Sequence, residues 1–220
     1  MIRTPGQIER ASMELIRAEL LEQGVTLAKE NEAVILRCIH ASADFDYAAN
    51  LRFTPDAVRR AKEALRRGTD LVTDTNMALA GISRPGLQKL GASAYCYMAE
   101  DFIAERAKAQ ETTRAAAAMD WAAEHNPGAV FAVGNAPTAL LRIAEQIREG
   151  MRPALVIAVP VGFVNVVESK ERIFSVCEEA DIPCIAAMGR KGGSSIAAAI
   201  CNALIYSAAD LLEPDARGWN

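Results

Sequence analysis

The sequence has few aromatic residues, few histidines and no paired cysteines, and each shortage argues against a class of protein. Aromatic residues are 5% of the 220 residues and hydrophobic residues are 51%, a balance that suits helices packed closely on a sheet better than an aromatic-rich β-sandwich. The five cysteines include no CxxC pair and their number is odd, which argues against both a disulfide framework and a zinc site. Because there are only two histidines, we expect no bound metal.

A surplus of basic residues is also missing. The formal net charge is −4, and acids and bases are interspersed rather than grouped. We therefore expect no nucleic-acid partner, because binding to phosphates normally requires a basic stripe. A specific acidic ligand remains compatible with this charge, since single arginines and helix N-termini can bind an anion locally.

Long apolar runs are missing as well. The longest, residues 154–164, contains Pro160 and Gly162 and is too short to span a bilayer. The first ten residues, MIRTPGQIER, contain no apolar signal region. We therefore expect a soluble, cytoplasmic protein without a membrane partner, and the length favours a single domain over residues 1–220.

What the chain does contain is an alternation of short apolar runs with longer helical patterns. The expected strands resemble those of sheets covered on both faces and are residues 70–74, 93–98, 129–133, 154–160 and 183–187. The expected helices are residues 6–23, 55–67, 76–81, 101–110, 113–125, 137–149, 166–180 and 194–208, with an irregular stretch between the first two. The alternation predicts a flavodoxin-like, doubly wound α/β fold, in which a five-stranded parallel sheet has helices on both faces and follows a mainly helical N-terminal portion.

Ligands of open parallel sheets bind beyond the carboxyl ends of the strands, so the residues after each strand are the most informative. After the strand at 129–133 comes the run Gly134–Thr138, in which glycine permits an unusual backbone angle, Asn135 can cap a helix and Pro137 suits the first helical turn. The helix start would then present free N–H groups to an anion. An ordinary tight turn is the alternative interpretation.

The next two junctions have a related composition. Residues 162–165 form an apolar loop where solvent exposure is usual, which suggests a cover over a ligand or a partner subunit. Lys170, soon after, either neutralises a carboxylate or lies on a helix surface. Residues 188–195 combine glycines, cations and hydroxyls into an anion-binding nest, without the order of a P-loop or a dinucleotide fingerprint. From the junctions we predict substrate contacts at Asn135, Thr138, Lys191, Gly193 and Ser194.

Two side chains stand out for chemistry. His40 closes an apolar segment three residues after Arg37, and the two would share one face if the segment is helical. Such a pair could hold an acid group and deliver a proton, although a capping or core histidine is the alternative. Arg114 lies in the first turn of an expected helix, where the dipole disfavours a cation, so it either pairs with an anion or is a solvated surface arginine. His125 ends a helix, which favours a structural role.

These residues carry a resemblance to a known family. The chain resembles the precorrin-8X methylmutases (precorrin isomerases) of cobalamin biosynthesis in segments that run in order over nearly its whole length. The matching segments are SMELIRAE at 12–19, RCIHA at 37–41, DTNM at 74–77, AGI at 80–82, TR at 113–114, GNAPTAL at 134–140, PVGFVNVVESKE at 160–171 and GRKGGS at 189–194.

The resemblance implies a homodimeric flavodoxin-like subunit without a cofactor of its own. The family reaction is an intramolecular [1,5]-sigmatropic shift of a methyl group from C11 to C12 of a corrin precursor. The family's catalytic histidine corresponds to His40, its substrate-contacting serine to Ser12, and its arginines to Arg37 and Arg114. One departure is that Ala115-Ala116 follows Arg114 where the family usually has Ser-Ala, which puts a hydroxyl contact in doubt but not the arginine.

The chemistry of the residues agrees with this resemblance. A large apolar ring fringed with carboxylates suits apolar loops beside anion-binding junctions, and a methyl group that never leaves the molecule requires a placed proton rather than a nucleophile. Residues 43–47 and 73–82 look more like the form that acts on the cobalt-containing precursor of the anaerobic route. The alternatives are a non-catalytic tetrapyrrole carrier, which would not need His40, and a flavin-binding flavodoxin relative, for which the acidic run at 74–76 is poorly suited.

Overall fold

The structure, a computed structural model that describes residues 4–218, is built on a mixed six-stranded sheet with the order β1-β6-β5-β4-β2-β3. Five strands are parallel, and β1 at one edge runs antiparallel to β6. The strands are β1 (Leu51–Phe53), β2 (Leu71–Thr73), β3 (Ala94–Tyr95), β4 (Val130–Val133), β5 (Leu155–Ala158) and β6 (Cys184–Ala187). The sequence-based count of five strands is therefore wrong by one.

All five predicted strands form, and they are the parallel ones. Numbered among themselves in chain order, they lie in the order 2-1-3-4-5, which is the flavodoxin-like doubly wound arrangement. The missed strand β1 has only three residues and pairs Leu51 with Ala187 and Phe53 with Ile185. It is extended because the edge of β6 offers hydrogen-bonding partners, and three residues with an arginine at the centre show no apolar run of their own.

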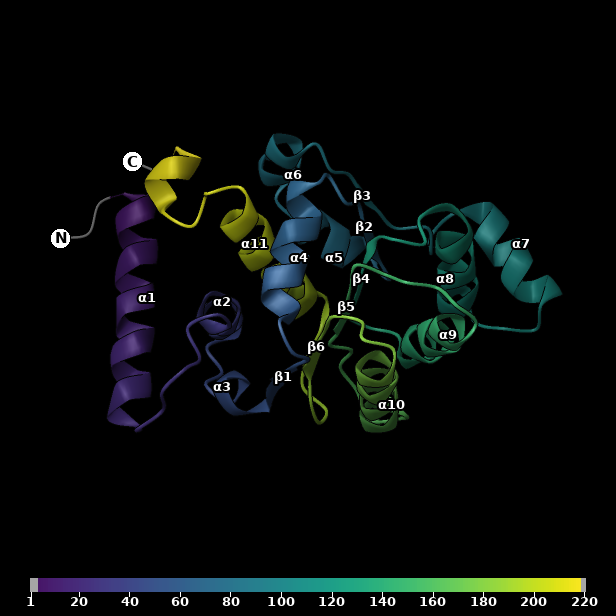
Figure 1. The fold of residues 1–220 in the computed structure, drawn as a ribbon, viewed down its shortest axis with the longest axis horizontal. Coiled ribbons are helices and arrows are strands. Elements are labelled where there is room, and N and C mark those ends of the chain that lie inside the picture. Colours follow the sequence, from purple (N-terminus) through teal and green to yellow (C-terminus); the bar gives the residue numbers. More distant parts are fainter. Residues whose placement is uncertain (1–3, 219–220) are drawn as a thin grey trace.

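Helices cover both faces of this sheet (Figure 1). They are α1 (Pro5–Glu22), α2 (Glu32–Ser42), α3 (Tyr47–Asn50), α4 (Ala57–Arg66), α5 (Asn76–Gly81), α6 (Arg84–Leu90), α7 (Asp101–Ala109), α8 (Arg114–His125), α9 (Pro137–Arg148), α10 (Val166–Glu179) and α11 (Ser194–Ala208), with a short 3-10 helix, η1 (Pro214–Arg217). None of the helices within residues 4–218 is long and apolar enough to cross a membrane.

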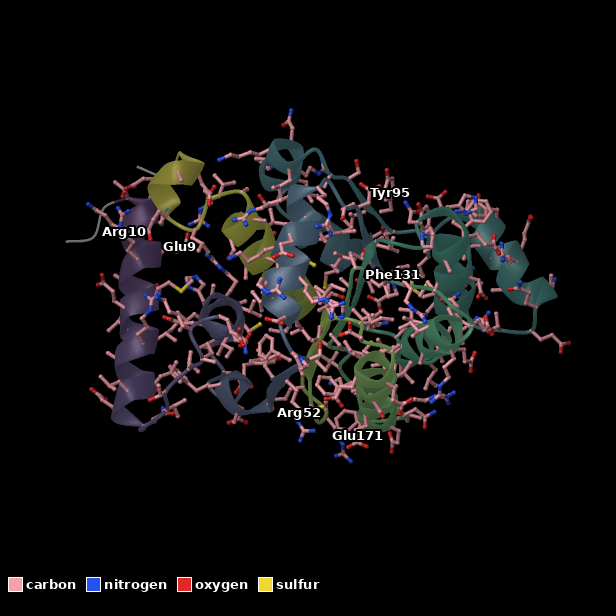
Figure 2. All side chains as sticks on the ribbon, in the orientation of Figure 1. Glu9, Arg10, Arg52, Tyr95, Phe131 and Glu171 are labelled. Carbon is pink, nitrogen blue, oxygen red and sulfur yellow. The ribbon has the colours of Figure 1, made fainter. Side chains whose placement is uncertain are left out.

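Two apolar cores lie on opposite faces of the sheet because neighbouring strand residues point to opposite sides. Val130 and Ala132 of β4 join the core beneath α4, α5, α6 and α11, whereas Phe131 and Val133 join the core beneath α7 to α10. Phe131 is fully buried between the two layers (Figure 2). This double burial explains why β4, β5 and β6 are continuous apolar runs.

The N-terminal portion is helical, as predicted, but it is more regular than expected. The stretch expected to be irregular contains α2, whose Val34, Leu36 and Ile39 are buried in the core beneath α11. Helix α1 lies outside α2, at the left of Figure 1, and meets η1 from the other end of the chain. Helix α6 was also missed, although Ser83 caps its first turn and Gly91 ends it.

Candidate active site

The carboxyl ends of β2, β4 and β6 meet at one edge of the sheet. The hydroxyls of Thr75, after β2, and Ser194, at the start of α11, are hydrogen-bonded at 2.8 Å. Gly134, after β4, lies against the same residue, and a Cβ atom added to it would be 2.7 Å from the Cα atom of Ser194. The close approach, rather than an unusual backbone angle, therefore requires glycine at this position.

A buried carboxylate occupies the amides of the β4–α9 junction. Asp74, 1% exposed, accepts hydrogen bonds at 2.8 Å from the backbone N–H groups of Gly134, Asn135 and Ala136. Burial raises the pKa of the Asp74 carboxyl, while the three backbone donors oppose that shift. From the sequence we expected free N–H groups here for an external anion. In the structure, the protein's own Asp74 carboxylate binds these N–H groups in place of an external anion.

The groups that this junction can offer to a ligand are therefore side chains. Asn135 is exposed, and the partly exposed hydroxyl of Thr138 accepts a hydrogen bond from the Thr113 hydroxyl at 2.9 Å. Thr113 is also the N-cap of α8, since its hydroxyl accepts from the N–H of Ala116. This contact brings Arg114, the first residue of α8, next to the junction. Arg114 is exposed, and its guanidinium has no hydrogen bond or ion pair within residues 4–218.

The β6–α11 loop packs on the end of β5. Gly192 adopts a φ of +154°, and a Cβ atom there would be 2.1 Å from the carbonyl oxygen of Val159, so only glycine fits. Gly193 donates its N–H to the same carbonyl at 2.8 Å and precedes the first residue of α11. The N–H groups of Ser194 and Ser195 find no acceptor among the described residues, so this helix start remains open to an anion.

Lys191 connects this loop to the end of α2. Its ammonium group contacts the carboxylates of Asp44, at 2.7 Å, and Asp46. Hydrogen bonds to these two carboxylates raise the pKa of Lys191 to about 12. From the sequence we predicted that Lys191 contacts the substrate, and in the structure its ammonium group is already paired with two carboxylates. The contact brings the C-terminal end of α2, and with it His40, to the loops at the carboxyl edge.

His40 lies in the last turn of α2 with an exposed side chain. Partial burial and then the positive charge of Arg37 lower the pKa of the His40 imidazole, and Glu9 opposes them. These effects favour the neutral form of the ring in the free protein.

Arg37 is engaged in a network that joins α1, α2, α11 and η1. Its guanidinium is 2.8 Å from Glu9, whose other oxygen accepts from Arg217 at 2.7 Å. Both arginines lie over the Tyr206 ring, at 5.4 and 4.6 Å from its centroid. Glu9 is at the end of α1 next to η1 (Figure 2). Ser12, one turn further along α1, donates its hydroxyl to the Ile8 carbonyl at 2.8 Å.

The cavity nearest to this network lies away from the sheet edge. It has a volume of about 390 Å³ and lies between α1 and α2. Arg37 lines it, whereas His40 and Ser12 do not. The predicted residues therefore fall into two groups, one at the α1–α2 contact and one at the carboxyl edge, and the end of α2 joins them.

Two functional candidates were misjudged from the sequence. No local pattern indicated that the Asp74 carboxylate binds backbone amides some 60 residues away. Lys170 was expected either to face a carboxylate or to lie on the surface, and both expectations are wrong. It is completely buried, and its ammonium group donates to the carbonyls of Gly189 and Lys191.

The apolar loop after β5 has the exposure that its sequence indicated. Phe163 is 83% exposed and Val164 is 77% exposed. The Arg190 guanidinium lies over the Phe163 ring, 5.5 Å from its centroid. Within residues 4–218, no three histidine, cysteine or acidic side chains gather where they could hold a metal ion.

Comparison with known proteins shows which family and which relatives this chain resembles. The family model described as precorrin-8X methylmutase matches residues 7–207. A cobalt-precorrin-8 methylmutase of Salmonella typhimurium is 44% identical over 177 residues, which are 80% of this chain and 81% of that protein. One of Priestia megaterium is 39% identical over 201 residues, covering 91% and 87% of the two chains.

A solved structure gives the same result. The precorrin-8X methylmutase of Thermus thermophilus superposes with a TM-score of 0.82 at 38% identity, covering 92% of this chain and 98% of the other. A precorrin-8X methylmutase of Pseudomonas aeruginosa is 37% identical over 92% of this chain and 96% of its own length.

Proposed function

The chain belongs to the precorrin-8X methylmutase family and is an isomerase of cobalamin biosynthesis, and from that premise we propose that it converts cobalt-precorrin-8 to cobyrinate at the carboxyl edge of its sheet. The reaction moves a methyl group from C11 to C12 of the macrocycle. We assign proton transfer to His40. One observation carries the assignment, namely that Lys191, in the loop after β6, binds Asp44 and Asp46, which directly follow the His40-bearing end of α2.

The arrangement supports such a reaction because a methyl shift within one molecule requires no nucleophile. The chain must hold a large ring, exclude water from it and place one proton. The exposed loop at Phe163 and Val164 offers apolar contact to the ring. Arg114, Asn135, Thr138 and the open start of α11 at Ser194 offer contacts to its carboxylates. Gly193, against Val159, keeps that helix start close to β5.

His40 is suited to both directions of proton transfer. In the free protein, partial burial and the charge of Arg37 lower its pKa, which favours the neutral ring. Carboxylates of a bound substrate act in the opposite direction and favour the protonated form. The imidazole can then give a proton to the macrocycle before the methyl group moves and accept one afterwards.

The experiment is turnover by the purified protein, followed through the absorbance of the macrocycle. Conversion of cobalt-precorrin-8 by the wild type together with loss of turnover in His40→Ala supports the proposal. A His40→Ala protein that turns over normally contradicts the role of His40. Tight binding of the ring without any turnover in the wild type would instead identify a corrinoid carrier.

The proposal that the substrate contains cobalt is based on the names of the relatives. Four that are 37 to 44% identical carry the name cobalt-precorrin-8 methylmutase, from Priestia, Leptospira, Salmonella and Methanothermobacter. The metal here is part of the substrate and not of the protein. Assays of both precursors side by side test this choice, and a higher kcat/KM for metal-free precorrin-8 would overturn it.

We further propose a homodimer, in which a second copy covers the outer side of α1. Ile8 and Leu15 are 54% and 70% exposed and lie two turns apart on one face, opposite the buried Glu9 and Leu20. We expect Leu15→Glu to shift the molecular mass in light scattering to that of one chain. Leu21→Glu is the control, because Leu21 is equally exposed on another side of the helix. A monomeric wild type would contradict the proposal.

A cytoplasmic location is also part of the proposal. All five cysteines are free thiols, and such thiols persist in reducing compartments. Fractionation of the source cells tests it, and recovery outside the cytoplasm would contradict it.

A further inference from the structure

Lys170 is a buried lysine that forms no ion pair with a carboxylate within residues 4–218. It lies on α10, is 0% exposed and is among the largest fully buried side chains of the described chain. Its ammonium group donates to the carbonyl of Gly189 at 2.9 Å and to that of Lys191 at 2.7 Å. Burial alone lowers its pKa, to about 8. Burial of a charge is costly, so a lysine here calls for an explanation.

The carbonyl of Arg190, between those of Gly189 and Lys191, is bound by the loop that leads into α10. Arg190 accepts a hydrogen bond from the N–H of Gly162 at 3.3 Å. Three consecutive carbonyls of the β6–α11 loop, at residues 189 to 191, are thus bound by α10 and by the loop that leads into it.

The geometry of the peptide group determines where the N–H groups of this loop point. In a trans peptide the C=O of one residue and the N–H of the next point in opposite directions. With the carbonyls of 189 to 191 turned toward Lys170 and Gly162, the N–H groups of Arg190, Lys191 and Gly192 are turned away from them. Among residues 4–218, the N–H groups of Arg190 and Gly192 have no acceptor, and the N–H of Lys191 closes the turn at residues 189 and 190. Such free N–H groups form a concave site for an anion.

We propose that Lys170 is a positioning residue, which turns the peptide groups of residues 189 to 192 so that the N–H groups of Arg190 and Gly192 face a carboxylate of the substrate. The proposal rests on the substrate site proposed above. Lysine suits the task because one ammonium group has several donors and can bind two carbonyls at once. Its charge also stays unneutralised beside the loop, which favours an anion there.

Substitution separates this role from a purely structural one. We expect Lys170→Met, which retains the volume but not the donors, to raise KM for the substrate about tenfold, with a much smaller fall in kcat, because the carboxylate is bound in ground and transition states alike. Lys170→Arg retains donors and should recover part of the affinity. Ile173→Val, one turn along the same helix and fully buried, is the control that lowers stability and leaves KM unchanged.

A second measurement needs no variant and avoids the risk that Lys170→Met does not fold. Hydrogen exchange of the wild type is compared with and without bound corrinoid product. We expect the amides of residues 190 and 192 to exchange more slowly in the complex. Unchanged exchange at these amides, or an unchanged KM in a folded Lys170→Met protein, overturns the proposal. Wild-type turnover is measured first, so a failure of the proposed function itself is recognised separately.

Discussion

The carboxylate of Asp74 accepts a hydrogen bond from the N–H of Gly134 at 2.8 Å, so that a buried acid after β2 holds the first residue after β4. The same carboxylate binds the next two amides of the junction. Substrate contacts at this position must therefore come from side chains and not from these amides.

Replacement of this acid tests how much the junction depends on it. We expect Asp74→Asn to lower the free energy of unfolding by about 3 kcal/mol, because the amide brings N–H groups of its own toward backbone donors. Urea unfolding measures the loss. Asp70→Asn is the control, since Asp70 accepts from the N–H of Ser93 near the surface, and its loss should be about 1 kcal/mol or less. Equal losses would contradict the special role of Asp74.

The two histidines make a matched pair for the catalytic assignment. We expect His40→Ala to lower kcat by about 10²-fold or more, the usual contribution of a general acid or base. His125→Ala should leave kcat unchanged, because His125 lies on α8 against Trp121, with its Nδ1 atom 2.8 Å from the Trp121 carbonyl. Steady-state rates of both variants test the catalytic role of His40, and a normal kcat in His40→Ala would refute that role.

The lowered pKa of His40 predicts a particular pH dependence. The profile of kcat/KM reports groups of the free enzyme, so it should show a pKa below the usual value of 6.5. The profile of kcat reports the enzyme–substrate complex, where substrate carboxylates should move that pKa upward. Both profiles come from the same set of rate measurements. A kcat pKa below that of kcat/KM would be the opposite of the expected shift.

Glu9 predicts how stability responds to acid. Burial of its carboxyl raises the pKa, but hydrogen bonds and charges from Arg217 and Arg37 outweigh it, and the pKa lies below 4.5. The stabilisation by the folded-state carboxylate is thus complete above pH 4.5 and is lost as the pH falls through the folded-state pKa. We expect Glu9→Gln to cost about 3 kcal/mol at pH 7.

The cost of Glu9→Gln should shrink steadily below pH 4.5, where the wild type loses the same carboxylate. Unfolding experiments at several pH values measure it. Glu14→Gln, on the exposed side of α1, should show little loss at any pH. A cost of Glu9→Gln that is independent of pH would contradict the network.

Arg114 is the exposed cation next to Thr138. If it binds a substrate carboxylate, Arg114→Ala should raise KM about tenfold, since a charge-assisted hydrogen bond contributes about 1.5–3 kcal/mol. Arg148→Ala, at the exposed far end of α9, should not change KM. An equal effect of both substitutions would indicate only a general change in charge.

Much of the fold could be predicted because its signals are local. Strands β4, β5 and β6 are apolar and buried on both faces, so a run such as Val130–Val133 indicates a buried strand without knowledge of its neighbours. Strand β1 could not be predicted in this way, because Leu51–Phe53 is extended only through its pairing with β6.

The sequence by itself determined the family, the alternation of parallel strands with helices and the nomination of His40, since these depend on motifs and on patterns along the chain. Only the tertiary structure decided which charges serve the fold. Asp74 and its amides are about 60 residues apart, and Lys191 and Asp46 are 145 apart. A buried or paired charge is recognised by what surrounds it in space, which no local pattern records. The burial of Lys170 and its hydrogen bonds to the carbonyls of Gly189 and Lys191 are therefore visible only in the folded chain.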